Sequence, residues 1–214
     1  MLKELKNPLR LSFIGGGMNS SIGKIHFMAS QLDKNFTIDS GFFSREKKTN
    51  IETQKQYNIN INRIYNNLDK LLINERKKID LFVVLAPTPN HYEILKKLIL
   101  NNVNIIVEKP ILSNFNEVKK LKKYLKGYNK KIYVVHNYIG YPAIREIQQL
   151  IRSNKFGKLL NFKLQMAQES FLRVQKKDQK VKTWRKYDHK IPNLFLDLGI
   201  HLFNLSYFLI KKTP

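Results

Sequence analysis

The strongest constraint on the fold of this chain is the alternation of short apolar runs with helical patterns as far as residue 135. The clearest run, residues 81–85, ends just before Pro87 and Pro89, which cannot continue a strand. Similar runs occupy residues 11–14, 36–43, 103–107 and 131–135, and helical patterns occupy residues 22–32, 51–57, 68–73, 91–100 and 116–125. Strands that alternate with helices form right-handed crossovers, so the sequence predicts an α/β fold with a doubly wound, Rossmann-type parallel sheet.

The pattern changes after residue 136. Residues 142–151 are helical in pattern, residues 159–166 alternate like a strand with one exposed face, and residues 168–188 are polar and loop-like. Residues 194–210 are strongly apolar at helical spacing. One strand and two helices cannot close a core alone. We therefore predict a dinucleotide-binding Rossmann domain over residues 1–136 and an incomplete α+β second domain over residues 137–214.

Composition narrows the function classes. The 214 residues include no cysteine, which excludes disulfides and thiolate metal sites. The net charge of +23 comes from lysines spread over nearly every segment, and Asn and Ile are abundant as well, as AT-rich coding produces. We expect solvated lysine faces and no specific nucleic-acid partner. No apolar run approaches the ~18 residues of a membrane helix, and the start lacks a signal-peptide core, so we expect a cytoplasmic protein without a membrane partner.

The glycine-rich segment Gly15–Gly23 lies between the first strand and the first helix, where such folds bind a pyrophosphate. Its glycines allow a tight turn and a close approach of the backbone to phosphates, whose charge the helix N-terminus favours. Ser20 stands where the third glycine of the usual pattern would be, and Gly23 follows one turn later. The alternative is a flexible turn without a ligand. The cofactor contacts expected here are Gly15, Gly17, Met18, Asn19, Ser20 and Ile22.

The end of the second strand bears on which nicotinamide cofactor is bound. An acidic residue there would accept hydrogen bonds from the ribose hydroxyls and indicate NAD. Ser44 and Arg45 are suited to cradle a 2′-phosphate instead, whereas Glu46 keeps NAD open. Arg45 as an ordinary solvated loop charge is a further alternative. The sequence therefore leaves NAD and NADP both open.

Two more segments follow strands at the carboxyl edge, where ligands of open α/β sheets bind. Thr88 and Asn90 follow the strand 81–85 and are suited both to a ligand and to turn and N-cap roles. Lys109 follows the strand 103–107; it could hold a substrate hydroxyl and stabilise developing negative charge, or be a surface lysine. The cofactor contacts expected at this edge are Pro87, Thr88, Asn90, His91, Glu108 and Lys109.

Asp197 and His201 are four residues apart, so on a helix they share one face. A histidine with a carboxylate neighbour is the usual composition of a general base. The alternatives are a structural histidine or a metal site, and the latter is weaker because no third ligand is nearby. The following residues Leu202, Phe203, Leu205 and Phe208 predict an apolar face that buries the helix against the sheet.

Taken in order, four segments resemble the Gfo/Idh/MocA family of NAD(P)-dependent oxidoreductases: Gly15–Gly23 with His26, Thr88-Pro89-Asn90, Glu108-Lys109-Pro110, and Asp197 with His201. The stretch Val135–Pro142, with Phe156-Gly157-Lys158 and Trp184-Arg185, resembles the branch of sugar dehydrogenases similar to levoglucosan and inositol dehydrogenases. The match runs over essentially the whole chain.

The resemblance implies hydride transfer between a sugar or cyclitol CH–OH and the nicotinamide of NAD or NADP. His201 would take the hydroxyl proton, Lys109 would assist, and Asp197 would position the substrate. It also implies pocket residues, with Asn137 at the cofactor and Tyr138, Tyr141, Trp184 and Arg185 at the substrate. Two alternatives remain, namely a glycosidase that uses bound NAD for transient oxidation and a cofactor-binding remnant without turnover.

The chain departs from the family pattern in two places. Glycines that usually precede the Asp197 segment are replaced by Ile191–Leu196. The resemblance also covers only the N-terminal half to two-thirds of a family member, without the large open sheet that backs the pocket and makes full-length relatives homo-oligomers. It thus implies a C-terminally truncated chain, with the apolar face of residues 194–210 partly uncovered.

Overall fold

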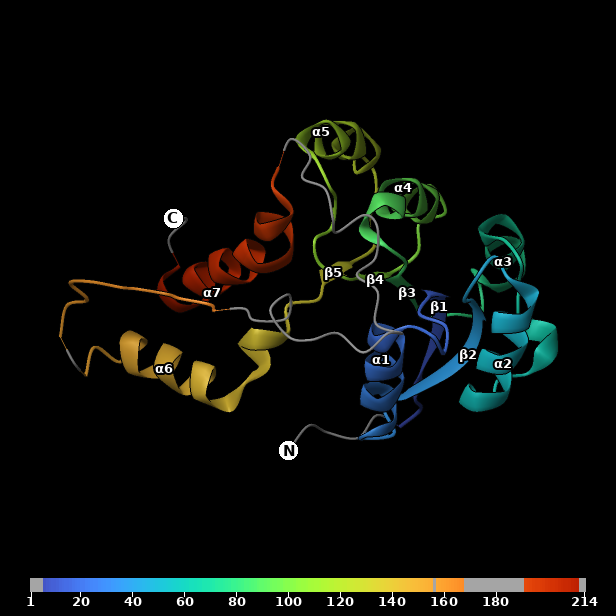
Figure 1. Cartoon of the computed structure of the whole chain (residues 1–214), viewed down its shortest axis with the longest axis horizontal. Helices are drawn as coiled ribbons and strands as arrows, with labels where there is room; N and C mark the ends of the chain where they lie inside the picture. Colours follow the sequence, from blue (N-terminus) through green and yellow to red (C-terminus); the bar gives the residue numbers. More distant parts are fainter. Residues whose placement is uncertain (1–5, 156, 168–190, 212–214) are drawn as a thin grey trace, which may run out of the picture. The chain divides into compact units, whose positions relative to one another are not determined.

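The computed structural model describes residues 6–155, 157–167 and 191–211, and it divides into two compact units, residues 1–134 and 135–214. Figure 1 shows the elements of both. Trp184 and Arg185, predicted to line a substrate pocket, lie outside the described residues.

The first unit is a parallel sheet of five strands, β1 (Leu9–Gly15), β2 (Phe36–Phe42), β3 (Leu81–Leu85), β4 (Ile105–Val107) and β5 (Ile132–Val134). Their order in the sheet is β2-β1-β3-β4-β5, and every neighbouring pair is parallel. The helices between them are α1 (Ser21–Gln31), α2 (Lys47–Tyr57), α3 (Leu68–Glu75), α4 (His91–Leu100) and α5 (Phe115–Tyr124). The predicted doubly wound α/β fold is confirmed.

Alternation along β3 divides the core of the first unit into two layers. Phe82 and Val84 are fully buried in one cluster together with apolar residues of α3, α4 and α5. Val83 and Leu85 belong to a second cluster on the opposite face, against which Phe27 of α1 packs. Figure 1 shows α4 and α5 on one side of the strands and α1 on the other. Because successive side chains of a strand point to opposite faces, a continuous apolar run is what a sheet covered on both sides requires.

One position of the sheet is filled by a fragment of a strand. Ile64, just after the short helix η1 (Ile61–Arg63), forms a single parallel bridge with Gly41 on the outer side of β2, and the Tyr65 N–H donates to the Gly41 carbonyl at 2.9 Å. If this bridge is counted as a strand, the order becomes 3-2-1-4-5-6, which is that of dinucleotide-binding sheets.

Charged side chains hold this fragment. Arg63 donates to Asp39 on β2 at 2.9 Å and to Glu75 on α3 at 2.7 Å, and the Tyr65 hydroxyl donates to Glu75 at 2.8 Å. Burial opposes ionisation of Glu75, but the hydrogen bonds from Arg63 and Tyr65 outweigh it and hold the pKa of this carboxyl below its ordinary value. Burial, with the bond to Glu75, raises the pKa of Tyr65 to about 12.

In its described part, the second unit is helical. It contains η3 (Asn137–Gly140), α6 (Pro142–Arg152), the π-helical turn η5 (Phe195–Gly199) and α7 (Ile200–Ile210). The predicted strand over residues 159–166 is wrong, because residues 158–167 have no regular structure. A strand needs a neighbour for its ladder, and the described residues of this unit supply none. The incomplete α+β second domain over residues 137–214 stays a prediction, because residues 168–190 lie outside the described residues.

The helix predicted over residues 194–210 is present, but residues 195–199 form a π-helical turn before α7 begins. A π-turn is wider than an α-turn and is frequent at functional sites. It is followed by α7, whose buried residues His201, Leu205 and Leu209 recur every fourth position. Gln148 of α6 donates its side-chain amide to the Phe208 carbonyl of α7. Phe203 was expected on the buried apolar face, but it is 47% exposed. The buried face of α7 contains His201, Leu205 and Leu209 instead.

No helix within the described ranges combines the length and the apolar character that crossing a membrane requires.

Candidate functional site

The glycine loop makes a turn that side chains would prevent. Gly15 and Gly16 have φ of +81° and +72°, in the left-handed region. A Cβ on Gly15 would also lie 2.6 Å from the backbone nitrogen of Ala86, the residue that follows β3. The loop therefore passes directly over the end of the neighbouring strand, at the carboxyl edge of the sheet.

Gly23 is the glycine that lets α1 approach the loop. A Cβ on Gly23 would lie 2.0 Å from the carbonyl oxygen of Gly16. Ser20 is the N-cap of α1, and its side chain accepts a hydrogen bond from the Gly23 N–H at 3.2 Å. The close packing that a third glycine would allow is thus found at Gly23, one turn after Ser20.

The N-terminal turn of α1 can meet an anion. The N–H groups of Ser21 and Ile22 belong to the first turn of α1, where the helix has no carbonyl four residues earlier to accept them. They therefore point out of the helix end. The Met18 N–H, by contrast, donates to the Thr53 hydroxyl at 2.9 Å and serves to hold the loop against α2. Thr53 is fully buried, and sequence reasoning missed it; a threonine in a polar helix gave no signal of this contact.

The end of β2 is fixed by α2. The Ser44 N–H donates to the Asn50 side chain at 2.9 Å, and the Asn50 amide donates back to the Ser44 carbonyl at 2.8 Å. The Ser44 hydroxyl accepts from the Glu46 N–H, and the Glu46 carboxylate accepts from the Thr49 hydroxyl at 3.1 Å. Arg45 is exposed. Asn50, which sequence reasoning also missed, thus sets the backbone at the position where a ribose would be recognised.

The loop after β3 contains a buried Thr88 and a fully buried His91. The His91 Nε2 lies 2.8 Å from the Ala86 carbonyl oxygen, and its Nδ1 lies 3.0 Å from the Pro110 carbonyl oxygen. Both ring nitrogens therefore lie against backbone carbonyls, and a cofactor contact of His91 stays a prediction. Asn90 lies at the expected N-cap position of α4, although its side chain makes no capping hydrogen bond.

The segment after β4 is held at the same edge. The Glu108 N–H donates to the Val84 carbonyl of β3 at 3.1 Å, which extends the pairing of the two strands. The Glu108 carboxylate lies 2.7 Å from Nε2 of His26 on α1. Lys109 follows and is partly buried. The first unit thus brings the glycine loop, Thr88 and Lys109 to the carboxyl edge of one sheet.

In the second unit, rings surround His201. The ring centroids of Tyr138 and His201 lie 4.7 Å apart at an interplanar angle of 82°, and those of His136 and His201 lie 6.3 Å apart. Tyr141 meets Tyr138 at 5.8 Å. The structure therefore brings together His201 and both tyrosines predicted for the substrate. His136 was not selected as a site residue, although it directly precedes Asn137 in the sequence.

Asp197 lies in the π-helical turn, four residues before His201. Gly199 lies between them, and a Cβ there would be 3.0 Å from the ring of Phe195. A larger residue at this position would require a small shift of the Phe195 ring. Asn137, predicted at the cofactor, is exposed at the start of η3.

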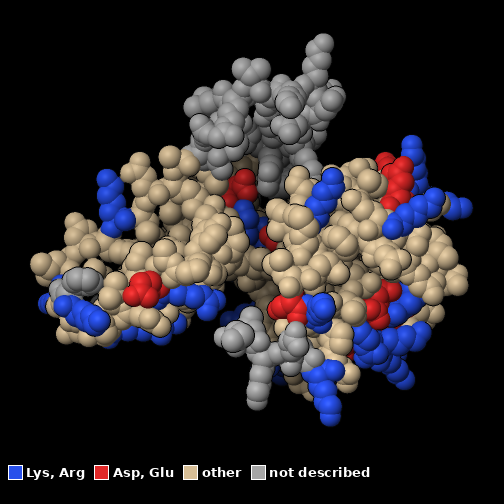
Figure 2. Space-filling model, turned by 90° about the horizontal axis from the view of Figure 1, so that it is seen from below, with Lys and Arg blue, Asp and Glu red and all other residues tan. Residues whose placement is uncertain are grey.

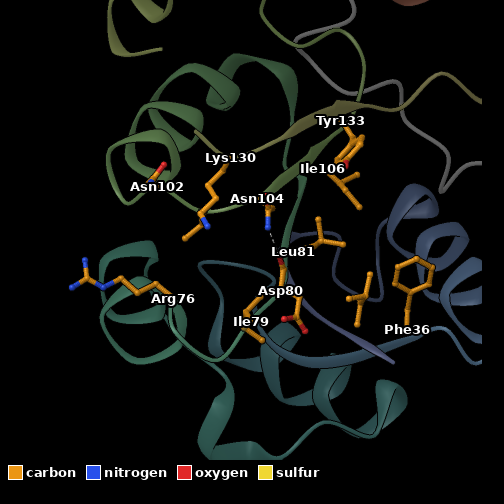
Figure 3. A pocket seen from close by; sticks show the side chains of 12 residues that line it. Phe36, Arg76, Ile79, Asp80, Leu81, Asn102, Asn104, Ile106, Lys130 and Tyr133 are labelled. Atoms are coloured by element: carbon orange, nitrogen blue, oxygen red, sulfur yellow. Dashed lines mark hydrogen bonds between the residues drawn. The ribbon is translucent and has the colours of Figure 1, made fainter. Parts of the chain in front are cut away.

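A cavity of about 730 Å³ in the first unit lies elsewhere. Its lining includes Leu9, Phe36 and Leu81, the first residues of β1, β2 and β3. Figure 3 shows its side chains, with Lys130 near Asn102 and Asn104 and with Arg76 at the edge of the group. It opens at the amino ends of the strands, so it is separate from the candidate site at their carboxyl ends.

Positive charge is spread over the surface. On the face drawn in Figure 2, Lys and Arg side chains occur in small groups separated by uncharged and acidic residues. Such scatter gives no continuous basic stripe on that face, which a nucleic-acid groove would present.

Comparisons with known proteins agree with this geometry. Residues 9–136 match the model of GFO_IDH_MocA, an oxidoreductase family with an NAD-binding Rossmann fold. The uncharacterised oxidoreductase YfiI of Bacillus subtilis (strain 168) is 26% identical over 217 residues, covering 97% of this chain and 55% of that protein. The chain spans about half the length of the curated relatives it matches.

Two solved structures of an inositol dehydrogenase homologue from Azotobacter vinelandii are similar as well. The complex with NAD+ has a TM-score of 0.67 at 25% identity, over 73% of this chain and 41% of that chain. The complex with NADH and myo-inositol has a TM-score of 0.78 over 98% of this chain and 54% of that chain; at 21% identity it shows the fold alone.

Proposed function

This chain belongs to the Gfo/Idh/MocA oxidoreductase family, whose Rossmann fold binds NAD, and we propose that it is a dehydrogenase chain that oxidises a sugar or cyclitol CH–OH. The observation that carries this proposal is the meeting of three features at one sheet edge. The glycine loop with the N-terminus of α1, the buried Thr88 and the partly buried Lys109 all follow strands whose carboxyl ends are adjacent. Ligands of open α/β sheets bind at that edge.

Nucleotide binding is assigned to the first unit. The outward amides of Ser21 and Ile22 would receive the pyrophosphate, and the backbone of Gly15–Gly17 would allow its close approach. When bound, the nicotinamide accepts or returns a hydride. Ser44 and Arg45 would contact the ribose or a 2′-phosphate there, and Thr88 would face the nicotinamide half.

Proton transfer is assigned to His201. Its ring, enclosed by His136 and Tyr138, would take the proton of the substrate hydroxyl as a general base. The Lys109 ammonium would stabilise the negative charge that develops on that oxygen. Asp197, Tyr138 and Tyr141 would orient the substrate. The cyclitol class is supported by the name of the Azotobacter relative, an inositol dehydrogenase homologue that is 25% identical in its NAD+ complex. The proposal extends to sugars, which present the same secondary alcohols.

The first experiment is a fluorescence titration of the 214-residue chain with NADH and with NADPH. We expect saturable binding of at least one nucleotide, and absence of binding to both overturns the proposal. Arg45→Ala separates the cofactors: it weakens NADPH alone if Arg45 contacts a 2′-phosphate, and it leaves both affinities unchanged if Arg45 is a solvated charge.

The second experiment measures NAD(P)H formation with inositols and sugars. Dehydrogenase activity should be lost in Lys109→Met and His201→Asn, while nucleotide binding persists. Hydrolysis of a glycoside with no net change in NAD would favour the glycosidase alternative. Nucleotide binding without turnover of any substrate would identify the chain as a non-catalytic nucleotide-binding fragment.

A further inference from the structure

Two histidines from helices on opposite faces of the sheet converge on the loop that carries Lys109. His26 lies on α1 and His91 is the first residue of α4. One is linked to Glu108, the residue before Lys109, and the other to Pro110, the residue after it. Figure 1 shows these two helices on either side of the strands.

The His26 contact is short and largely shielded from water. Its Nε2 donates to the Glu108 carboxylate at 2.7 Å, and the two side chains are 18% and 13% exposed. The second oxygen of that carboxylate lies 3.3 Å from the Lys109 N–H. A charge-assisted bond in a partly desolvated place restrains both partners more than a surface pair does. Through this chain of contacts, α1 restrains the peptide that precedes the Lys109 side chain.

The His91 contact restrains the other side of the loop. The ring is 1% exposed and lies between two backbone carbonyls, those of Ala86 after β3 and Pro110 after β4. Ala86 is also the residue over which Gly15 turns. His91 therefore links the lysine loop to the loop that supports the nucleotide-binding turn.

We propose that His26 and His91 are positioning residues that hold the Glu108–Pro110 loop, and with it Lys109, in the geometry needed at the bound nucleotide. This inference rests on the proposed function. A lysine side chain has four rotatable bonds, so its ammonium is placed only as well as its backbone is fixed. Misplacement of a reacting group by about 1 Å is enough to cost a large part of its effect.

The test uses the full chain with two readouts, the Kd for NADH (or NADPH if that is the nucleotide bound) and the acetylation rate of Lys109 measured by mass spectrometry. Exposed Lys126 in the same molecule is the internal standard. In His26→Leu we expect the Kd to rise about tenfold, as loss of a charge-assisted hydrogen bond allows. The Lys109 to Lys126 acetylation ratio should rise roughly threefold as the loop opens locally.

Conservative variants separate positioning from general stabilisation. His26→Gln keeps a donor for Glu108 and should restore both readouts to near the original, whereas His26→Leu should not. His91→Gln keeps one donor between the two carbonyls and should give an intermediate acetylation ratio. Met28→Leu, at an exposed site of α1, is the matched control and should change neither readout.

Different outcomes overturn the proposed function and the positioning role of the two histidines. If the unmodified chain binds neither nucleotide, the proposed function fails. If it binds but His26→Leu leaves both the Kd and the acetylation ratio unchanged, the positioning role alone is overturned. A lower melting temperature with an unchanged acetylation ratio, or failure of His26→Gln to differ from His26→Leu, also overturns it. If His26→Leu does not fold, Glu108→Gln weakens the same bond and gives the same two readouts.

Discussion

The two units differ in how their apolar residues are used. In the first unit, both faces of the sheet are covered and residues such as Phe13, Phe82 and Val84 are fully buried. In the described part of the second unit, the buried hydrophobic residues are Leu205 and Leu209, whereas Phe195 and Tyr207 are 52% and 50% exposed. Nucleotide binding is therefore proposed for the unit with an extensive buried core, whereas the proposed base His201 lies in a unit whose described residues bury few apolar side chains.

Substitutions of buried residues should change stability most, and they test whether the two units unfold independently. Phe82→Ala removes a fully buried ring and should lower the free energy of unfolding of the first unit by about 3–5 kcal/mol. Leu205→Ala should lower protection only in residues 135–211 and leave the first unit unchanged. Hydrogen exchange resolved by segment measures both. Equal loss of protection in both units after Leu205→Ala would mean that the comparison is wrong.

Loss of the buried ion pair in the first unit should lower the free energy of unfolding slightly less than loss of a core ring. Arg63→Ala leaves Glu75, whose side chain is 1% exposed, without its ion-pair partner and should cost about 3 kcal/mol in urea unfolding. Lys48→Ala is the control, because its ammonium lies 4.0 Å from Glu52 on the surface, and it should change stability by less than about 0.5 kcal/mol. A similar cost for both variants would remove the special role of the Arg63 network.

Glycine substitutions in the two units should differ in their effect on the nucleotide Kd. Gly23→Ala places a methyl group 2.0 Å from the Gly16 carbonyl oxygen, so α1 must shift and the nucleotide Kd should rise at least about tenfold. Gly140→Ala in the second unit meets no atom within 4 Å and should leave that Kd unchanged. Calorimetric titration of both variants decides the matter, and an unchanged Kd in Gly23→Ala would argue against this loop as the phosphate site.

The smallest effect is on acid stability. The pKa of Glu75 is lower in the folded chain than its ordinary value of 4.5, so the folded state binds fewer protons at that carboxyl. Its contribution is present above about pH 4.5 and is lost as the pH falls through the lowered value. Urea midpoints for the first unit should therefore fall below pH 4.5, and less steeply in Glu75→Gln. Parallel curves for the two proteins would exclude this cause.

The sequence specified most of the first unit because its signals are local. The run 81–85 and the helix 91–100 agree with β3 and α4 at both ends, since prolines stop the first and apolar spacing marks the second. Contacts between segments were less predictable. A motif fixes spacing only, whereas the approach of α1 to Gly16 at Gly23 depends on the three-dimensional turn. The partners of His91 likewise come from two different loops, those of Ala86 and Pro110.

In the second unit, local pattern was less informative. Alternation over residues 159–166 resembles a strand, but a strand forms only where another offers its hydrogen bonds. The cluster of His201 with Tyr138 joins residues far apart in the sequence. Spacing from Asp197 suggested His201, whereas only the family pattern suggested Tyr138. His136 escaped notice because a single histidine after a strand carries no periodic signal.

The strand fragment beside β2 has a consequence for behaviour at high concentration. Within the described residues, the outer side of β2 has a β-bridge only at Gly41, so the part of β2 nearer Phe36 has no strand partner on that side. Open edges can template pairing with another molecule, and natural sheets discourage this with charges. Asp39 and its partner Arg63 place two charges beside that edge. Removal of this ion pair should therefore increase self-association at high concentration, even in variants that still fold.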